Sequence, residues 1–131
     1  SGFEDFLKAL QEAGISIALA TAADKGNIDF TLDALAIRKY FDVITGSEEV
    51  SFGKPHPDVY LKSAAKLHLA PGQCVAFEDT PSGIRSASDA GMEVVGVATT
   101  HTREELQLYP LLTIIENYES KDLIRMLKNA S

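Results

Sequence analysis

Short apolar runs alternate with segments of helical periodicity along the 131 residues. Runs this short and this apolar are typical of strands buried on both faces of a parallel sheet. Between them, apolar residues recur every three to four positions, as they do on one face of an amphipathic helix. Predicted strands cover 15–20, 43–45, 74–77, 94–98 and 112–115, and predicted helices begin near 3, 27, 57, 81, 102 and 120. Such alternation predicts βαβ units and an α/β fold, with helices on both faces of a doubly wound, mostly parallel sheet.

Residues that begin or end helices stand at the boundaries of these segments. Asn27 is suited to cap the second helix, and Pro57 to occupy the first position of the third. Pro81 begins a fourth helix that Gly91 closes, and a Thr-x-x-Glu pattern starting at Thr102 has the form of a capping box. A last helix is expected over 120–129, with its apolar residues facing inward. No repeat or linker divides the chain, so residues 1–131 are expected to form one domain.

Composition narrows the classes of partner and compartment. The chain is 45% hydrophobic and 24% charged, as in ordinary globular proteins, which argues against disorder. Its formal net charge is −7 without a basic stripe, so neither nucleic acid nor an anionic membrane is expected as a partner. Cys74 is the only cysteine, which excludes an internal disulfide and a cysteine-based zinc site. A reduced, cytoplasmic setting is expected.

Polar residues follow three of the predicted strands. Thr21 comes directly after the first strand, Lys54 lies in the loop after the second, and Glu78 and Asp79 follow the third. Because ligands of open α/β sheets bind at the carboxyl ends of the strands, these side chains are expected to face one rim. A hydroxyl, a cation and an acid pair together indicate a site for a phosphate and a divalent metal.

Each of these groups suits a part of that chemistry. Mg²⁺ prefers oxygen ligands and usually takes one or two carboxylates, which Glu78 and Asp79 can supply. Lys54, held in a Gly-Lys-Pro turn, can act as a point charge on a phosphate. The Thr21 hydroxyl and the backbone amide of Ala22 can donate to an anion in a loop that leads to a helix.

Taken singly, the same residues have commoner structural interpretations. Adjacent acids before a helix, such as Glu78 and Asp79, most often cap it or interact with its dipole. Lys54 alone is most simply a solvated surface residue. Thr21 alone is most simply a turn residue whose hydroxyl forms a hydrogen bond with the nearby backbone. His101 stands in a strand-to-helix loop from which it could approach the rim. The joint placement, rather than any one residue, favours the phosphate site.

Three segments resemble motifs of the haloacid dehalogenase superfamily. Gly53–Tyr60 (GKPHPDVY) and Phe77–Ile84 (FEDTPSGI) resemble its third and fourth motifs, and Ile17–Thr21 (IALAT) resembles its second. Their order and spacing also match. The whole chain is similar to the core of the branch that includes β-phosphoglucomutase and small sugar-phosphate phosphatases.

The resemblance implies Mg²⁺-dependent phosphoryl transfer on a small phosphorylated metabolite such as a sugar phosphate, through an aspartyl-phosphate. In that scheme Thr21 hydrogen-bonds the transferring phosphoryl group, and Lys54 neutralises that group and the attacking aspartate. Glu78 and Asp79 hold Mg²⁺. Asn27 lies near a position that helps the mutases bind the phosphate of their substrate.

The sequence departs from the family at its first motif. That motif is Asp-x-Asp, in which the first Asp is the nucleophile and the second the general acid/base, and no Asp-x-Asp occurs in residues 1–131. The family's helical cap is also not found. The resemblance therefore implies the carboxy-terminal part of a Rossmann-like core without its first strand, which belongs between the strands ending at Thr21 and Phe77. An amino-terminal segment carrying Asp-x-Asp is the expected partner, without which the chain is expected to be inactive.

Two other functions stay open on the residues alone. Receiver domains of phospho-signalling have a similar length and fold, an acid pair, a threonine and a lysine, although they place them in a different order along the chain. A non-catalytic domain that binds phosphate or a partner protein could also keep this rim. The choice between phosphatase and mutase depends on the cap and on the first motif, so it is left open as well.

Overall fold

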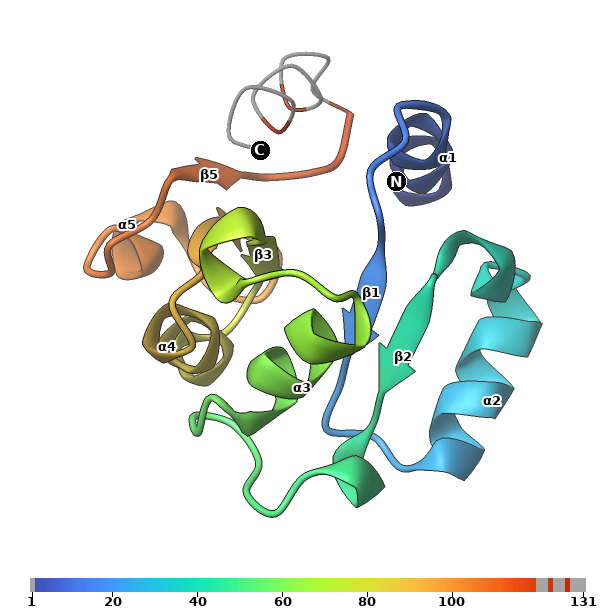
Figure 1. Cartoon of the computed structure of the whole chain (residues 1–131). Helices are drawn as coiled ribbons and strands as arrows, with labels where there is room; N and C mark the ends of the chain where they lie inside the picture. The colour runs from blue at the N-terminus through green and yellow to red at the C-terminus, as the bar shows by residue number, and fades with distance from the viewer. Residues whose placement is uncertain (1, 120–122, 124–126, 128–131) are drawn as a thin grey trace.

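The computed structural model describes residues 2–119, 123 and 127 (Figure 1). Its helices are α1 (Phe3–Glu12), α2 (Lys25–Leu35), α3 (Asp58–Lys66), α4 (Pro81–Asp89) and α5 (Arg103–Leu106). Its strands are β1 (Ala18–Ala20), β2 (Val43–Thr45), β3 (Val75–Glu78), β4 (Glu93–Val97) and β5 (Thr113–Ile115). Single 3₁₀ turns lie at Arg38–Tyr40, Ser47–Glu49 and Pro71–Gln73. No helix in this part of the chain is both long and apolar enough to cross a lipid bilayer.

The strands form two groups, and every pairing is parallel. β1 pairs with β2, and β4 lies between β3 and β5. Helix α3 packs against both β1 and β2 and also against α4, which packs on β3 and β4. Figure 1 shows α3 in front of the two strand groups, bridging them. The prediction of an α/β fold with mostly parallel strands is confirmed.

Successive residues of β3 enter different apolar clusters, so this strand is covered on both faces. Val75 and Phe77 pack against a cluster centred on α1 and α2, whereas Ala76 belongs to a cluster built from α3 and α4. In β1, Leu19 and Ala20 divide in the same way. Side chains alternate across a strand, so the two clusters lie on opposite faces of the sheet. The predicted covering of both faces is therefore present.

The edges of β1 and β3 that face each other carry no strand between them among the described residues. A hollow of about 710 Å³ lies there, lined by both strands and by Phe6, Tyr60 and Tyr118. Protein interiors leave few voids larger than a water molecule. This β1–β3 hollow is therefore a feature that ordinary core packing does not produce.

Of the capping residues predicted for two helices, one is confirmed and one is wrong. Thr102 forms the predicted capping box, since its Oγ1 accepts a hydrogen bond from the Glu105 amide while the Glu105 carboxylate accepts one from the Thr102 amide. Asn27 as a cap is wrong. Asp24 is the capping residue, and its carboxylate accepts a hydrogen bond from the Asn27 amide at 2.9 Å. A carboxylate at the N-terminal end of a helix is favoured by the helix dipole, and Asp24 stands directly before α2. Asn27 is already the third residue of the helix, so it cannot cap it.

Other boundaries shift by a few residues. Pro81 begins its helix as predicted, but Pro57 is the residue before α3 rather than the first residue in it. The first strand is shorter than predicted because the Ile17 amide donates to the Asp42 side chain at 2.7 Å, not to a neighbouring strand. The last helix, predicted over 120–129, lies outside the described residues apart from two buried leucines, 123 and 127.

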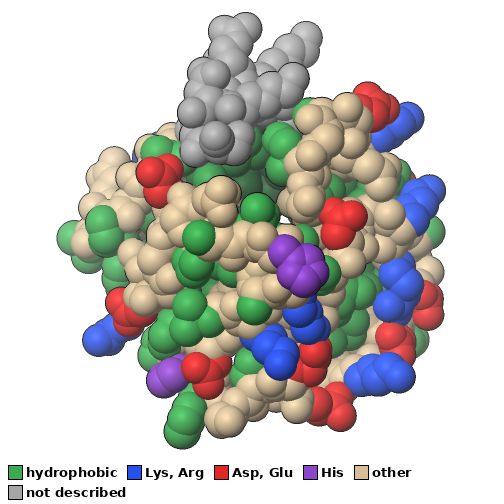
Figure 2. Space-filling model, in the orientation of Figure 1, with side chains coloured by type: hydrophobic (Ala, Val, Ile, Leu, Met, Phe, Trp, Pro, Cys, Tyr) green, Lys and Arg blue, Asp and Glu red, His purple; other side chains and the backbone are tan. Residues whose placement is uncertain are grey.

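Charged side chains stand in mixed pairs on the surface. Figure 2 shows acidic and basic side chains beside one another over one face, with apolar side chains between them. Arg38 lies 2.7 Å from Asp29, and Lys66 lies 2.5 Å from Glu49. Lys66 also donates to the carbonyl of Ile44, the middle residue of β2, which links α3 to that strand.

Candidate functional site

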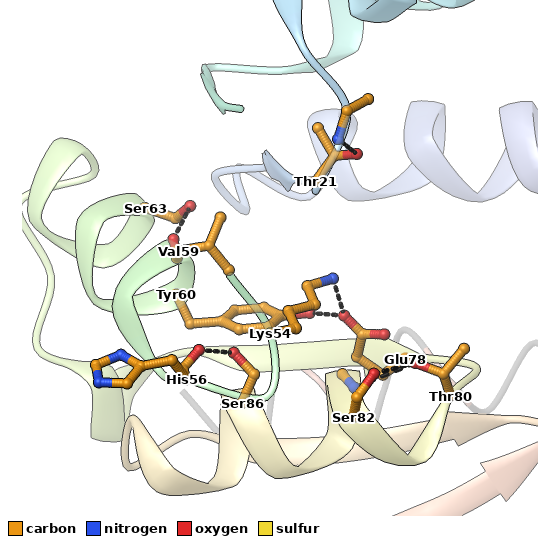
Figure 3. A network of polar contacts seen from close by, with 12 residues as sticks. Thr21, Lys54, His56, Val59, Tyr60, Ser63, Glu78, Thr80, Ser82 and Ser86 are labelled. Carbon is orange, nitrogen blue, oxygen red and sulfur yellow. Dashed lines mark hydrogen bonds and ion pairs between the residues drawn. The ribbon is translucent and has the colours of Figure 1, made fainter. Parts of the chain in front are cut away.

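Lys54 and Glu78 meet where the loop after β2 reaches the end of β3. Lys54 Nζ lies 2.6 Å from Glu78 Oε2, and the two side chains are 18% and 7% exposed (Figure 3). Two of the positions that the sequence placed on one rim are thus in direct contact. Such a pair is largely shielded from water, so the attraction between its charges is less screened than at the surface.

Tyr60, on the first turn of α3, completes this contact. Its hydroxyl donates a hydrogen bond to the same oxygen, Glu78 Oε2, and Lys54 Nζ lies 5.3 Å from the centre of its ring. Burial and the charge of Glu78 raise the pKa of the Tyr60 phenol well above its ordinary value, so the hydroxyl keeps its proton. Sequence reasoning missed this residue, because an aromatic at helical spacing indicates a core position.

Gly83 forms the wall behind Glu78. A Cβ placed on Gly83 would lie 1.9 Å from Glu78 Oε1, so the carboxylate occupies space that only glycine leaves. Thr80 caps the helix there, and its hydroxyl accepts a hydrogen bond from the Gly83 amide at 3.1 Å. The negative charge of Glu78 therefore rests against the first turn of α4, where the helix dipole favours it.

The loop that carries Lys54 is anchored on α4. It contains a cis peptide bond between Lys54 and Pro55, and the His56 amide donates to the carbonyl of Gly53 at 3.0 Å. Ser86, fully buried on α4, donates its hydroxyl to the His56 carbonyl at 2.6 Å. These hydrogen bonds hold in place the loop that carries Lys54.

Asp79 is held by its backbone. Its carbonyl oxygen lies 3.2 Å from the Thr100 hydroxyl and 3.2 Å from Nδ1 of His101, in the loop after β4. No described residue makes a hydrogen bond or ion pair with the Asp79 carboxylate. His101 does stand at the rim, and its contact with Asp79 is one that the sequence did not suggest.

Thr21 and Ala22 lie at the end of β1. The Thr21 hydroxyl accepts a hydrogen bond from the Ala23 amide at 3.1 Å, which is the local turn contact considered from the sequence. Figure 3 shows Thr21 apart from Lys54 and Tyr60, and no hydrogen bond joins it to them in the described part of the chain. The amide of Ala22 donates to no described residue, so it is available to an anion.

Asn27 is exposed on the first turn of α2, six residues beyond Thr21. Its amide is taken by Asp24, and no described residue contacts its side chain through a hydrogen bond. Asn27 is therefore open to solvent and is not joined to the group formed by Lys54, Tyr60 and Glu78.

The donor set fits a magnesium ion better than a metal that needs many protein ligands. Within residues 2–119, 123 and 127, no three or more His, Cys, Asp or Glu side chains are grouped as a metal site. Glu78 and Asp79 provide two adjacent carboxylates, and Oε1 of Glu78 accepts no hydrogen bond from a described residue. Mg²⁺ commonly uses one or two carboxylates and completes its shell with water and phosphate oxygens.

Comparison with known proteins identifies a family whose sequence pattern matches this chain. The sequence profile of a family described as haloacid dehalogenase-like hydrolase matches residues 1–97. This stretch contains every residue that the sequence analysis selected for the site, from Thr21 to Asp79.

Individual proteins resemble the chain over most of its length. It is 33% identical over 105 residues to validoxylamine A 7'-phosphate phosphatase of Streptomyces hygroscopicus subsp. limoneus, covering 80% of this chain and 49% of that protein. It is 36% identical over 92 residues to the phosphorylated carbohydrates phosphatase of Thermotoga maritima, covering 70% and 43%. A crystal structure of a β-phosphoglucomutase-like protein from the same organism superimposes with a TM-score of 0.88 at 29% identity, covering 96% of this chain and 59% of that one. The chain thus spans about half the length of the curated relatives it matches.

Proposed function

This chain belongs to the haloacid dehalogenase-like hydrolase family, and on that basis we propose that it supplies most of the core of a Mg²⁺-dependent phosphatase or phosphomutase. The observation that carries the proposal is the contact of Lys54 with Glu78, which joins the third and fourth motifs at one point. The proposed substrate is a small phosphorylated metabolite, such as a sugar phosphate. Names of the relatives, one acting on phosphorylated carbohydrates, support this class.

Each side chain has a role in the proposed reaction. Lys54 neutralises charge on the transferring phosphoryl group and on the attacking carboxylate, and the Thr21 hydroxyl and Ala22 amide donate to phosphoryl oxygens. Glu78 and Asp79 hold Mg²⁺, which when bound polarises the phosphoryl group as a Lewis acid. Thr21 must turn its hydroxyl hydrogen outward for this, which its contact with Ala23 permits because the oxygen is the acceptor there.

Asn27 has a separate role in the proposal. It is exposed on the loop-to-helix segment that follows Thr21, and its side chain amide is open to solvent. We assign it to the phosphate of the substrate, the role that the resemblance to the mutases implies for a residue near this position.

The nucleophile in this proposal enters through the β1–β3 hollow. A strand inserted there would pair with the facing edges of β1 and β3, which pair with no strand of the described residues on that side, and its side chains would face apolar clusters on both sides. A strand covered on both faces in this way consists almost entirely of apolar residues. If it lies parallel to β3, it ends at the level of Glu78. An Asp-x-Asp at its carboxyl end would then reach Lys54, form an aspartyl-phosphate with its first Asp and pass a proton with its second.

The test supplies the proposed amino-terminal segment to the chain. The amino-terminal portion of the Thermotoga maritima phosphatase that this chain does not match is fused before residue 1, and phosphate release from a panel of sugar phosphates is measured with Mg²⁺ and with EDTA. Turnover that needs Mg²⁺ and falls about 100-fold or more in Lys54→Ala and Asp79→Asn is expected. Asp89→Asn, an exposed acid on α4, is the matched control and should stay within about twofold.

Other outcomes point to other functions. Phosphate binding without turnover in the fusion would favour a non-catalytic binding domain. Stoichiometric labelling of the unfused chain by acetyl phosphate would favour a receiver-like domain and contradict the proposal. Full turnover in Asp79→Asn would show that the carboxylates have been assigned wrongly.

A further inference from the structure

Three side chains from three separate segments meet at one carboxylate oxygen. The Tyr60 hydroxyl and the Lys54 ammonium both donate to Oε2 of Glu78, at the end of β3. Tyr60 and Glu78 are each only 7% exposed, so little of either side chain meets solvent. The contact is therefore a built feature of the interior and not a chance meeting of surface groups.

Tyr60 touches both charges of the pair. Its hydroxyl binds Glu78, while the face of its ring lies 5.3 Å from Lys54 Nζ, within range of a cation–π interaction. The ring is fixed by burial in the cluster that also contains Val59 and Ala64 of the same helix. Because Tyr60 belongs to α3 and contacts both groups, it fixes the carboxylate and the ammonium relative to this helix.

The two oxygens of Glu78 are used unequally. Oε2 takes both donors, whereas Oε1 lies against Gly83 and accepts no hydrogen bond from a described residue. Rotating the carboxylate would break two charge-assisted hydrogen bonds, which are among the stronger ones in proteins. The arrangement therefore holds Oε1 in one orientation before any ligand arrives.

We infer that Tyr60 is a positioning residue, whose hydroxyl fixes the Glu78 carboxylate so that Oε1 is presented to a divalent cation while Oε2 retains Lys54. This inference rests on the proposed function for its metal-binding half. Its other half, the ordering of Lys54 through Glu78, concerns the chain alone and can be measured without metal.

Tyr60→Phe is the variant that tests it. The ring and its packing stay, and only the hydroxyl is lost. Tyr40→Phe is the matched control, because the buried Tyr40 also donates its hydroxyl to a carboxylate, Glu4 Oε2 of α1, at 2.9 Å. Both variants lose one tyrosine–glutamate hydrogen bond, so a general loss of stability affects both.

Two quantities are measured on the 131-residue chain. The first is the rate of reductive methylation of Lys54, relative to Lys66 in the same sample, followed by peptide mass spectrometry. Lys66 is a suitable internal reference because it also forms an ion pair, with Glu49 at 2.5 Å. The second is the affinity for Mg²⁺, measured by calorimetry.

Tyr60→Phe is expected to raise the Lys54 to Lys66 ratio by up to about tenfold, the limit set by the free energy of the hydrogen bond to Glu78 that is lost, because a carboxylate that is free to rotate holds Lys54 less firmly. It is expected to weaken Mg²⁺ binding by about tenfold or more, as changes behind a metal ligand do. Tyr40→Phe should change neither. An unchanged Lys54 ratio in Tyr60→Phe would overturn the inference, whatever happens to Mg²⁺. If the ratio rises and the parent chain binds no Mg²⁺, the positioning of Lys54 holds and the metal site of the proposed function fails.

Discussion

Replacing Gly83 by alanine puts a methyl group where the Glu78 carboxylate lies. The new Cβ would stand 1.9 Å from Oε1 and 2.2 Å from the carboxylate carbon of Glu78. Non-bonded atoms do not approach so closely, so the carboxylate must move. Its oxygen Oε2 is held by Lys54 and Tyr60, and a shift therefore breaks contacts that lie in the interior.

The size of the effect follows from two opposed terms. Alanine is favoured over glycine inside a helix by about 1 kcal/mol. Breaking a buried ion pair so that a charge is left without its partner costs about 3–5 kcal/mol. Gly83→Ala is therefore expected to lower the free energy of unfolding by about 2–4 kcal/mol.

Urea unfolding of the chain, followed by circular dichroism, measures this difference. Gly26→Ala is the control, because Gly26 also lies in the first turn of a helix, α2, and the nearest atom to its added Cβ is Asp24 Oδ1 at an ordinary 3.6 Å. It is expected to be neutral or to gain about 0.5–1 kcal/mol. If Gly83→Ala proves as stable as Gly26→Ala, the Glu78 carboxylate does not rest against α4 and the geometry of the site is wrong.

Three further predictions concern capping, pH and catalysis. Thr102→Ala removes the cap of α5 and should lower the free energy of unfolding by about 1 kcal/mol in the same urea assay. The hydrogen bond from Lys66 lowers the pKa of Glu49 most, and the hydrogen bond from the Gly46 amide lowers it further. The contribution of these two contacts to stability is therefore present at neutral pH and lost as pH falls through that lowered pKa. Lys66→Met should therefore flatten the loss of stability on acidification, measured as the urea midpoint at decreasing pH. In the fusion, Lys54→Ala should slow phosphoryl transfer about 100-fold or more, with turnover at saturating substrate as the measurement.

Periodicity was enough to predict most of the fold. The alternating strands and helices follow from apolar patterns that the structure uses directly, as in β3, whose residues feed clusters on both faces. Local chemistry placed the cap at Thr102 correctly, since the capping box is complete within four residues. The cap of α2 was missed because Asp24 and Asn27 are both good capping residues and only the backbone conformation decides between them.

The site was predictable only as far as the ends of strands determine it. Parallel strands bring their carboxyl ends to one edge, which is why Lys54 and Glu78 could be expected to meet. Tyr60 could not be found this way, since its ring follows the apolar face of α3 and its hydroxyl has no pattern in the sequence. The contact of His101 with the Asp79 carbonyl depends on the path of two loops, which periodicity does not describe.

The proposed function requires a strand that carries the attacking carboxylate between β1 and β3. Amide hydrogen exchange of the chain, read residue by residue by NMR, tests it directly when a synthetic peptide of apolar residues ending in Asp-x-Asp is added. Alternate amides along the facing edges of β1 and β3 should exchange fast in the chain alone and become protected with the peptide, while the β4–β5 ladder is unaffected. Protection of the β1 and β3 edges without peptide, or peptide binding that leaves them unprotected, would contradict the placement of this strand.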